Sequence, residues 1–176
     1  NEILRSPIER RRLVNVLELL KPGWAASNPP ECPYAPLLGS WQITSRWFLT
    51  DGSTREADAE WHFTLVLGGY GVQDVLYRKG NPPERRGTSI RCYDRAIGAW
   101  RVCWMVPAGG EFVTLVARVE DGRIVQEGGA LDGSSLQRWT FSEMSGEGFL
   151  WQGEGSVDGG STWMLDQVMR ATRSPG

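Results

Sequence analysis

Apolar and polar residues alternate with a period of two along most of the chain from Gly39 onward. Turn signals rich in glycine and aspartate interrupt the alternation, among them Asp51-Gly52 and Asp121-Gly122, because glycine adopts the positive φ of a tight turn at little cost. This pattern predicts about ten strands. They cover residues 39–49, 60–67, 70–77, 86–93, 99–106, 111–120, 123–129, 135–142, 148–157 and 162–173.

The regular spacing of these strands, with no helical pattern between them, indicates an antiparallel meander. Ten strands in an open sheet would leave two exposed edges, and closing the sheet removes both. We therefore predict an all-β fold, a roughly ten-stranded antiparallel up-and-down barrel. A two-sheet sandwich is the alternative.

The residues before the barrel predict one α-helix followed by a proline-rich tether. Ser6-Pro7-Ile8-Glu9 is typical of a helix N-terminus, and Lys21-Pro22-Gly23 ends the helical pattern. Apolar residues recur between them at helical spacing, at Leu13, Val16, Leu17 and Leu20. The predicted organisation is an N-terminal helix and tether over 1–36 and a barrel over 37–174.

Large aromatic side chains gather on one face of the predicted strands. Because side chains alternate between the faces of a strand, Trp41 and Trp47 share one face of 39–49, opposite Gln42 and Arg46. The interior of a barrel of this size either fills with side chains or holds one small ligand. Gly153 and Gly155 lie on the same strand face as Trp151 and would leave empty space inside the barrel, because glycine has no side chain. We predict a cavity for an apolar, ring-containing or polyunsaturated molecule. Its candidate residues are Trp41, Trp47, Trp61, Phe63, Trp100, Trp104, Trp139, Phe141 and Trp151.

Composition excludes several other classes of function. The net charge of −2 over 176 residues leaves no basic surface for nucleic acid or an anionic membrane, and no apolar run approaches the ~18 residues of a membrane span. One histidine and three scattered cysteines do not make a zinc site. The odd cysteine count fits a reducing compartment, so we expect a cytoplasmic protein. We also expect it to hold no metal and no cofactor.

The catalytic residues of an enzyme with this cavity would have to be carboxylates. Alternation places His62 and Cys103 on the outer faces of their strands. The one histidine is therefore not available inside the barrel as a base for a serine or cysteine nucleophile. Asp74 and Glu127 are the candidate acids, because burial in an aromatic interior raises a carboxyl pKa toward neutrality. An ion pair of Asp74 with Arg91 or Arg138 is the structural alternative.

Three functional hypotheses remain open. The first is a binding protein for a small apolar or aromatic ligand. The second is a cofactor-independent cyclase or isomerase of a natural-product pathway, which would act by confining its substrate. In the third, the barrel is solid and the helix at 7–20 is a contact with a partner or with a second copy in a homodimer.

Several short motifs, in order, resemble those of a calycin-like barrel family of unknown function. They are Leu37-Leu38-Gly39-Ser40-Trp41, Tyr93-Asp94 before Trp100, the S-x-D-G-G-x-T-W motif from Ser156 to Trp163, and a closing Arg173. That family is related in shape to lipocalins, fatty-acid-binding proteins and nitrobindin, so the resemblance implies a barrel of about ten strands. Haem-binding relatives such as nitrobindin present a histidine near the C-terminal strand to the iron. This chain has none after His62, so haem is not expected.

Overall fold

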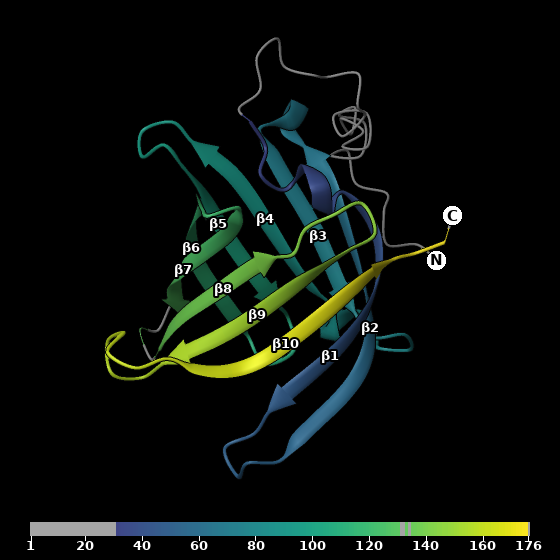
Figure 1. Ribbon diagram of the computed structural model, residues 1–176, viewed down its shortest axis with the longest axis vertical. Coiled ribbons are helices and arrows are strands. Elements are labelled where there is room, and N and C mark those ends of the chain that lie inside the picture. Colours follow the sequence, from purple (N-terminus) through teal and green to yellow (C-terminus); the bar gives the residue numbers. More distant parts are fainter. Residues whose placement is uncertain (1–30, 131–132, 134, 176) are drawn as a thin grey trace, which may run out of the picture.

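The computed structural model describes residues 31–175 except 131, 132 and 134. Ten antiparallel strands form a closed barrel (Figure 1). The strands are β1 (Gly39–Phe48), β2 (Thr54–Val66), β3 (Gly71–Tyr77), β4 (Gly87–Asp94), β5 (Ala99–Val106), β6 (Glu111–Glu120), β7 (Arg123–Ala130), β8 (Leu136–Ser142), β9 (Gly148–Ser156) and β10 (Met164–Arg173).

Each strand pairs with its neighbours in the chain, and β1 also pairs with β10, with Trp41 opposite Arg173. This last pairing closes the barrel, so the predicted all-β up-and-down barrel is confirmed and the two-sheet sandwich is not adopted. The main difference is β2, which begins at Thr54 rather than at residue 60. Its first residues are exposed on both faces where the β1–β2 hairpin projects from the barrel, and such a segment shows no alternation of apolar and polar residues.

Helical structure is sparse in the described part of the chain. It consists of the three-residue 3₁₀ turns η3 (Ala35–Leu37), η4 (Leu67–Gly69) and η5 (Pro83–Arg85), and no described helix has the length or apolarity to span a membrane. The α-helix predicted within residues 6–20 lies outside the described residues.

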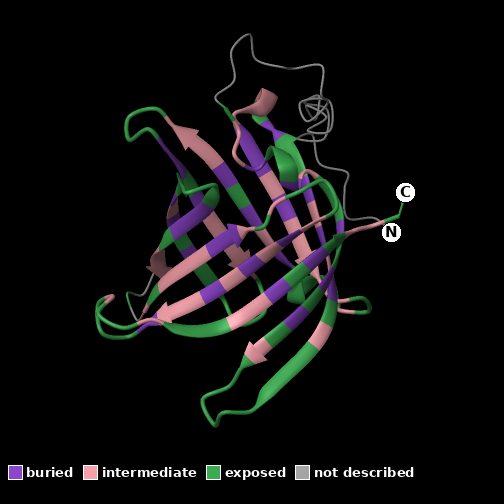
Figure 2. Cartoon of the chain, in the orientation of Figure 1, coloured by how far each residue is buried: buried purple, intermediate pink, exposed green. Residues whose placement is uncertain are grey.

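Buried and exposed residues alternate along the strands as a barrel with one inner face requires (Figure 2). In β1, the side chains of Trp41, Ile43 and Ser45 are buried while Gln42 and Thr44 are exposed. The aromatic faces of the strands therefore point inward.

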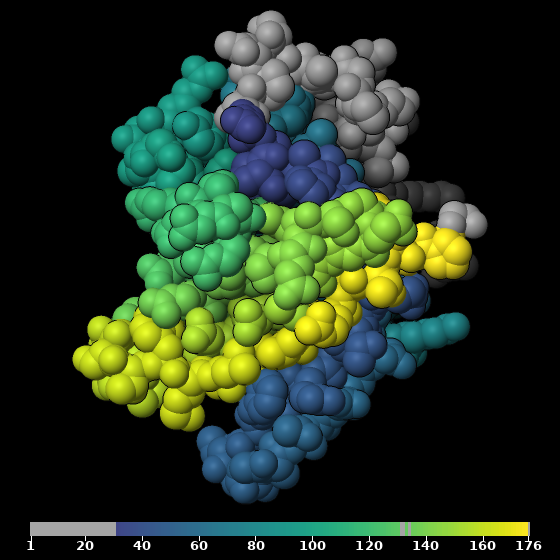
Figure 3. Space-filling model, in the orientation of Figure 1, coloured from purple at the N-terminus to yellow at the C-terminus, as the bar shows by residue number. Residues whose placement is uncertain are grey.

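Residues 31–38 pack against one end of the barrel (Figure 3). Tyr34 and Leu37 in this segment are fully buried. The ring of Tyr34 meets Trp100 edge-on at 5.5 Å and Phe141 at 6.3 Å between centroids, and Trp41 Nε1 donates to the Leu37 carbonyl at 2.7 Å. The last residues of the predicted tether thus form a plug, and we call this the closed end.

The motifs behind the family resemblance hold the barrel together at two places. At the closed end the guanidinium of Arg173 lies 3.9 Å from the centre of the Trp41 ring and donates to the Leu38 carbonyl at 2.9 Å. In the β9–β10 turn, Asp158 accepts bonds from the Thr162 backbone at 2.9 Å and from Ser156 Oγ at 2.8 Å. These bonds lower the pKa of Asp158 to about 2. In this structure the first motif, the β9–β10 turn motif and Arg173 therefore have structural roles.

Candidate functional site

A cavity of about 290 Å³ lies inside the barrel at the end opposite the plug, which we call the open end. The strands that reach this end contribute large flat side chains to its wall. Five tryptophans line it: Trp47, Trp61, Trp104, Trp139 and Trp151. The predicted interior space therefore exists, but only in one half of the barrel.

The nine side chains predicted to bind a ligand divide between the cavity and the solid core. The five tryptophans above line the cavity. The other four, Trp41, Phe63, Trp100 and Phe141, are at most 4% exposed and belong to the core. Trp61 joins the two groups, because its ring also packs against Phe63, with 4.9 Å between centroids.

Two glycines make room for indole rings at the open end, because they have no side chain. A Cβ atom on Gly87 would lie 1.9 Å from the ring of Trp104, and one on Gly153 would lie 2.6 Å from the ring of Trp151. Gly153 therefore makes room for the Trp151 indole, and it also lines the cavity. Trp139 lies between these rings, 6.2 Å from Trp104 and 5.8 Å from Trp151 between centroids.

A buried ion pair forms the base of the cavity. Arg91 on β4 and Asp74 on β3 are each 1% exposed, and their side chains are paired. Ser89 completes the cluster, since its backbone N–H donates to Asp74 Oδ1 at 3.0 Å and its Oγ accepts from Arg91 Nη2 at 3.3 Å. Of the three, Arg91 and Ser89 line the cavity. The pairing foreseen as the structural alternative for Asp74 is the one present.

Aromatic rings surround the guanidinium of Arg91 on its other sides. Its central carbon lies 4.9 Å from the centroid of Tyr34, 5.6 Å from that of Phe63 and 5.9 Å from that of Phe141. Ring faces carry negative partial charge and compensate in part for the water that a buried cation loses. Arg91 therefore separates the plug from the cavity and contacts both.

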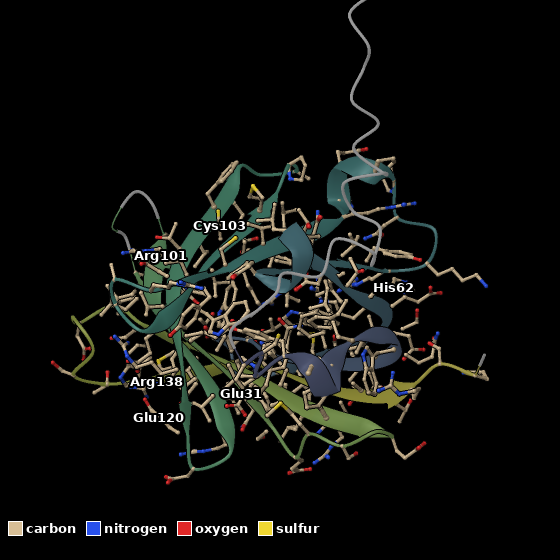
Figure 4. All side chains as sticks on the ribbon, turned by 90° about the horizontal axis from the view of Figure 1, so that it is seen from above. Glu31, His62, Arg101, Cys103, Glu120 and Arg138 are labelled. Atoms are coloured by element: carbon tan, nitrogen blue, oxygen red, sulfur yellow. The ribbon has the colours of Figure 1, made fainter. Side chains whose placement is uncertain are left out.

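Neither candidate catalytic acid lines the cavity. Asp74 lies beneath Arg91, and Glu127 is half-exposed on the outer face of β7, 2.6 Å from Arg138 Nε. Its placement inside the barrel was wrong, because its strand neighbours Gln126 and Val125 are both buried and hide the alternation. His62 and Cys103 lie outside as predicted: His62 bonds to Ser40 Oγ at 2.8 Å, and Cys103 lines an outer groove (Figure 4).

Two other carboxylates line the cavity, and the sequence analysis missed both. Glu111 accepts a bond from Trp104 Nε1 at 3.2 Å, and it shares the parity of the buried Val113, so alternation alone would have found it. Asp166 lies in a β-bulge, where the register of β10 against β9 shifts between Leu165 and Gln167. A bulge breaks the period of two, so the alternation of residues could not show that Asp166 lines the cavity. Burial raises the pKa of Asp166.

A more open groove of about 910 Å³ borders the plug, lined in part by Glu31, Cys32, Trp100 and Met144. Described residues of the barrel strands line the interior cavity, and we assign the candidate site there. Among the described residues, no three histidine, cysteine, aspartate or glutamate side chains gather to hold a metal ion.

The sequence matches no family model and no curated protein. Its structure is similar to that of the S-type phycobiliprotein lyase CPES from Guillardia theta, with a TM-score of 0.54 and 9% identity over 81% of this chain and 91% of that one. It is also similar to Rv2717c from M. tuberculosis, with a TM-score of 0.52 and 16% identity over 80% of this chain and 94% of that one. Both similarities extend over about four fifths of the closed ten-stranded barrel chain described above. At such low identity the likeness shows the fold alone.

Proposed function

We propose that this protein binds a small apolar molecule containing one or more rings in the cavity at the open end of the barrel. The observation that carries the proposal is an unfilled space walled by five indoles inside a core that is otherwise packed. Protein interiors are filled to the density of organic crystals, so a space of about 290 Å³ represents a large loss of contacts. A ligand that restores those contacts is stabilised by burial of its apolar surface and by ring stacking.

The size of the cavity limits the ligand. Pockets for drug-sized molecules have volumes of roughly 300–1,000 Å³, so about 290 Å³ lies at the lower end. The wall of the space favours a molecule that contains rings, since the indoles of Trp104, Trp139 and Trp151 line it and aromatic rings pack well against one another. A compound of two or three fused rings is the best match.

The fold supports this proposal. Barrels of about this size hold one small ligand inside when side chains do not fill them, and one similar structure is that of a phycobiliprotein lyase. A cyclase or isomerase acting in the same cavity remains the alternative. It would depend on Glu111 and Asp166, because these carboxylates line the cavity while Asp74 and Glu127 do not.

Filling the cavity tests the proposal. Leu76 lines it, and Leu76→Trp adds a ring inside. We expect calorimetric titration with a panel of two- and three-ring aromatics, small terpenoids and fatty acids to show saturable binding to the wild type. The filled variant should bind the same compounds at least tenfold more weakly, because the ring occupies their place.

Ile90→Trp is the matched control. Ile90 lies on the outer face of β4 and is 39% exposed, so the same new ring there should leave binding unchanged. Unaltered circular dichroism establishes that both variants fold. If no compound of the panel binds the wild type, or if Leu76→Trp binds as well as the wild type, the cavity is not a binding site.

A further inference from the structure

Three buried polar groups lack a hydrogen-bond partner among the described residues: Trp61 Nε1, Arg91 Nε and Gln126 Nε2. Gln126 belongs to the closed end, where its other amide atom accepts a bond from the Tyr34 hydroxyl at 3.1 Å. Trp61 and Arg91 both line the cavity. Each is almost fully buried, with 3% and 1% of its surface exposed. The two side chains that form the base of the cavity therefore each hold a buried N–H donor beneath its surface, with no acceptor from the described residues.

These two donors lie in one neighbourhood. Trp61 on β2 and Arg91 on β4 pack against the same two rings: Phe63 is 4.9 Å from the Trp61 ring and 5.6 Å from the Arg91 guanidinium carbon. Phe141 is 5.6 Å and 5.9 Å from them. A buried donor without a partner costs about 1–3 kcal/mol, and natural structures contain few of them. A ligand oxygen that displaced these two side chains and entered between them would give both donors an acceptor.

The charges around the cavity determine which kind of oxygen group, charged or uncharged, can bind to these donors. Arg91 is already neutralised by Asp74, so the cluster at the base has no net charge to attract an anion. The other ionisable side chains that line the cavity, Glu111 and Asp166, are both acids. A carboxylate placed against this wall would be a buried charge without a counter-ion of its own, which is strongly unfavourable. A carbonyl oxygen accepts the same hydrogen bonds without that penalty.

We propose that the ligand carries an uncharged carbonyl group, which enters first and accepts hydrogen bonds from Trp61 Nε1 and Arg91 Nε, while its rings lie among Trp104, Trp139 and Trp151. This inference rests on the proposed function and names its ligand class, a planar aromatic ketone, quinone or amide. Arg91, whose charge is compensated by Asp74, would donate a hydrogen bond to the ligand and would not bind an anion.

Three probes of nearly the same shape test this assignment: 2-acetylnaphthalene, 2-isopropenylnaphthalene and 2-naphthoate. The first has a neutral carbonyl, the second replaces that oxygen by carbon, and the third carries a charge. By calorimetry we expect the ketone to bind the wild-type protein about tenfold more tightly than the hydrocarbon. The naphthoate should bind more weakly than the ketone. The carbonyl stretching band of the bound ketone should move to lower wavenumber relative to the ketone in an alkane.

Trp61→Phe removes one donor and keeps a ring. We expect the preference for ketone over hydrocarbon to fall to about threefold in this variant, a ratio that a general loosening of the cavity would not change. Trp100→Phe is the matched control, because Trp100 belongs to the closed end and does not line the cavity. It should retain the wild-type preference.

The outcomes separate the two proposals. If the hydrocarbon binds as tightly as the ketone, or if Trp61→Phe keeps the full preference, the carbonyl assignment is overturned and the cavity remains a binding site. Tightest binding of naphthoate would also overturn it, in favour of an anion site at Arg91. If none of the three probes binds, the carbonyl assignment fails, and the broader panel of aromatics, terpenoids and fatty acids decides whether the cavity is a binding site.

Discussion

The two ends of this barrel are built from the same kinds of side chain and have opposite character. At the closed end, Trp41, Trp100 and Phe141 pack around Tyr34 and are at most 4% exposed. At the open end, Trp47, Trp104 and Trp139 are half-exposed and surround a cavity. The difference arises from the plug, because residues 31–38 place Tyr34 and Leu37 inside one end, and no described segment enters the cavity at the other end in the same way.

This comparison shows that an aromatic interior is by itself neither a core nor a binding site. The rings become a core where another part of the chain fills the space between them, and they line a cavity where it does not. The Arg91–Asp74 pair lies at the boundary of the two halves, with Tyr34 on one side and the cavity on the other.

The largest effect should come from breaking this boundary. Asp74→Ala leaves the buried guanidinium of Arg91 without its counter-ion, and removal of one partner of a buried pair typically costs about 3–5 kcal/mol. We expect a loss of that size in the free energy of unfolding measured with urea.

The double variant Asp74→Leu, Arg91→Met is the control for the first prediction. Replacing both charges by apolar groups of similar size is often neutral, so it should recover most of the lost stability. A loss below about 1 kcal/mol in Asp74→Ala would show that Arg91 is hydrated and that the two halves are not separated by a dry pair.

A matched pair on β8 compares the two ends directly. Phe141 and Trp139 point to the same inner face, the first fully buried at the closed end and the second half-exposed at the cavity. Phe141→Ala should cost about 3–5 kcal/mol of stability, since it opens a hole in a filled core. Trp139→Ala should cost about 1–2 kcal/mol and weaken the binding of two-ring aromatics about tenfold.

Urea unfolding and calorimetric titration measure the two halves of this second prediction. Equal losses of stability in the two variants would mean that the open end is as tightly packed as the closed end. Unchanged ligand affinity in Trp139→Ala would place the ligand elsewhere.

The smallest effect concerns the β9–β10 turn beside the open end. Hydrogen bonds from Thr162 and Ser156 hold the pKa of Asp158 at about 2, below its ordinary value of 3.8. A carboxyl whose pKa is lowered by folding stabilises the protein above its unfolded pKa, and this contribution disappears as the pH falls through the folded value. Wild type should therefore be slightly more stable than Asp158→Asn at pH 6.

Thermal unfolding of both proteins between pH 6 and pH 2 checks the sign. The difference in melting temperature should narrow from about pH 4 to about pH 2, where the wild-type side chain takes up its proton. A difference that grows toward low pH contradicts the assigned hydrogen bonds. Asp51→Asn, in the exposed β1–β2 turn where Ser53 donates to the carboxylate, gives a comparison at a turn remote from the motif.

Most of the barrel could be predicted from the sequence because alternation and turn residues are local signals. The inner face of β1 is clear from Trp41 and Ile43 alone. Strand β4 is the opposite case, because its apolar Ile90 faces outward and is 39% exposed, while its charged Arg91 faces inward and is 1% exposed. Arg91 is buried because Asp74 lies on the adjacent strand, a fact that depends on register.

The site was only partly predictable for the same reason. Parity identified the five cavity tryptophans, but it could not separate them from the core rings, because the plug comes from a proline-rich segment that shows no strand pattern. It also missed Asp166, whose position results from a bulge. Features that come from pairing between distant segments leave no local signal.

The seam between β1 and β10 has a consequence for synthesis. Arg173 bonds to the carbonyl of Leu38, 135 positions earlier, and the two strands that close the barrel are the first and the last of the ten. During translation the nascent sheet therefore remains open, with two unpaired edges, until β10 has left the ribosome. Such distant pairing is slow to form, so ligand uptake at the open end must wait for the whole barrel to be made.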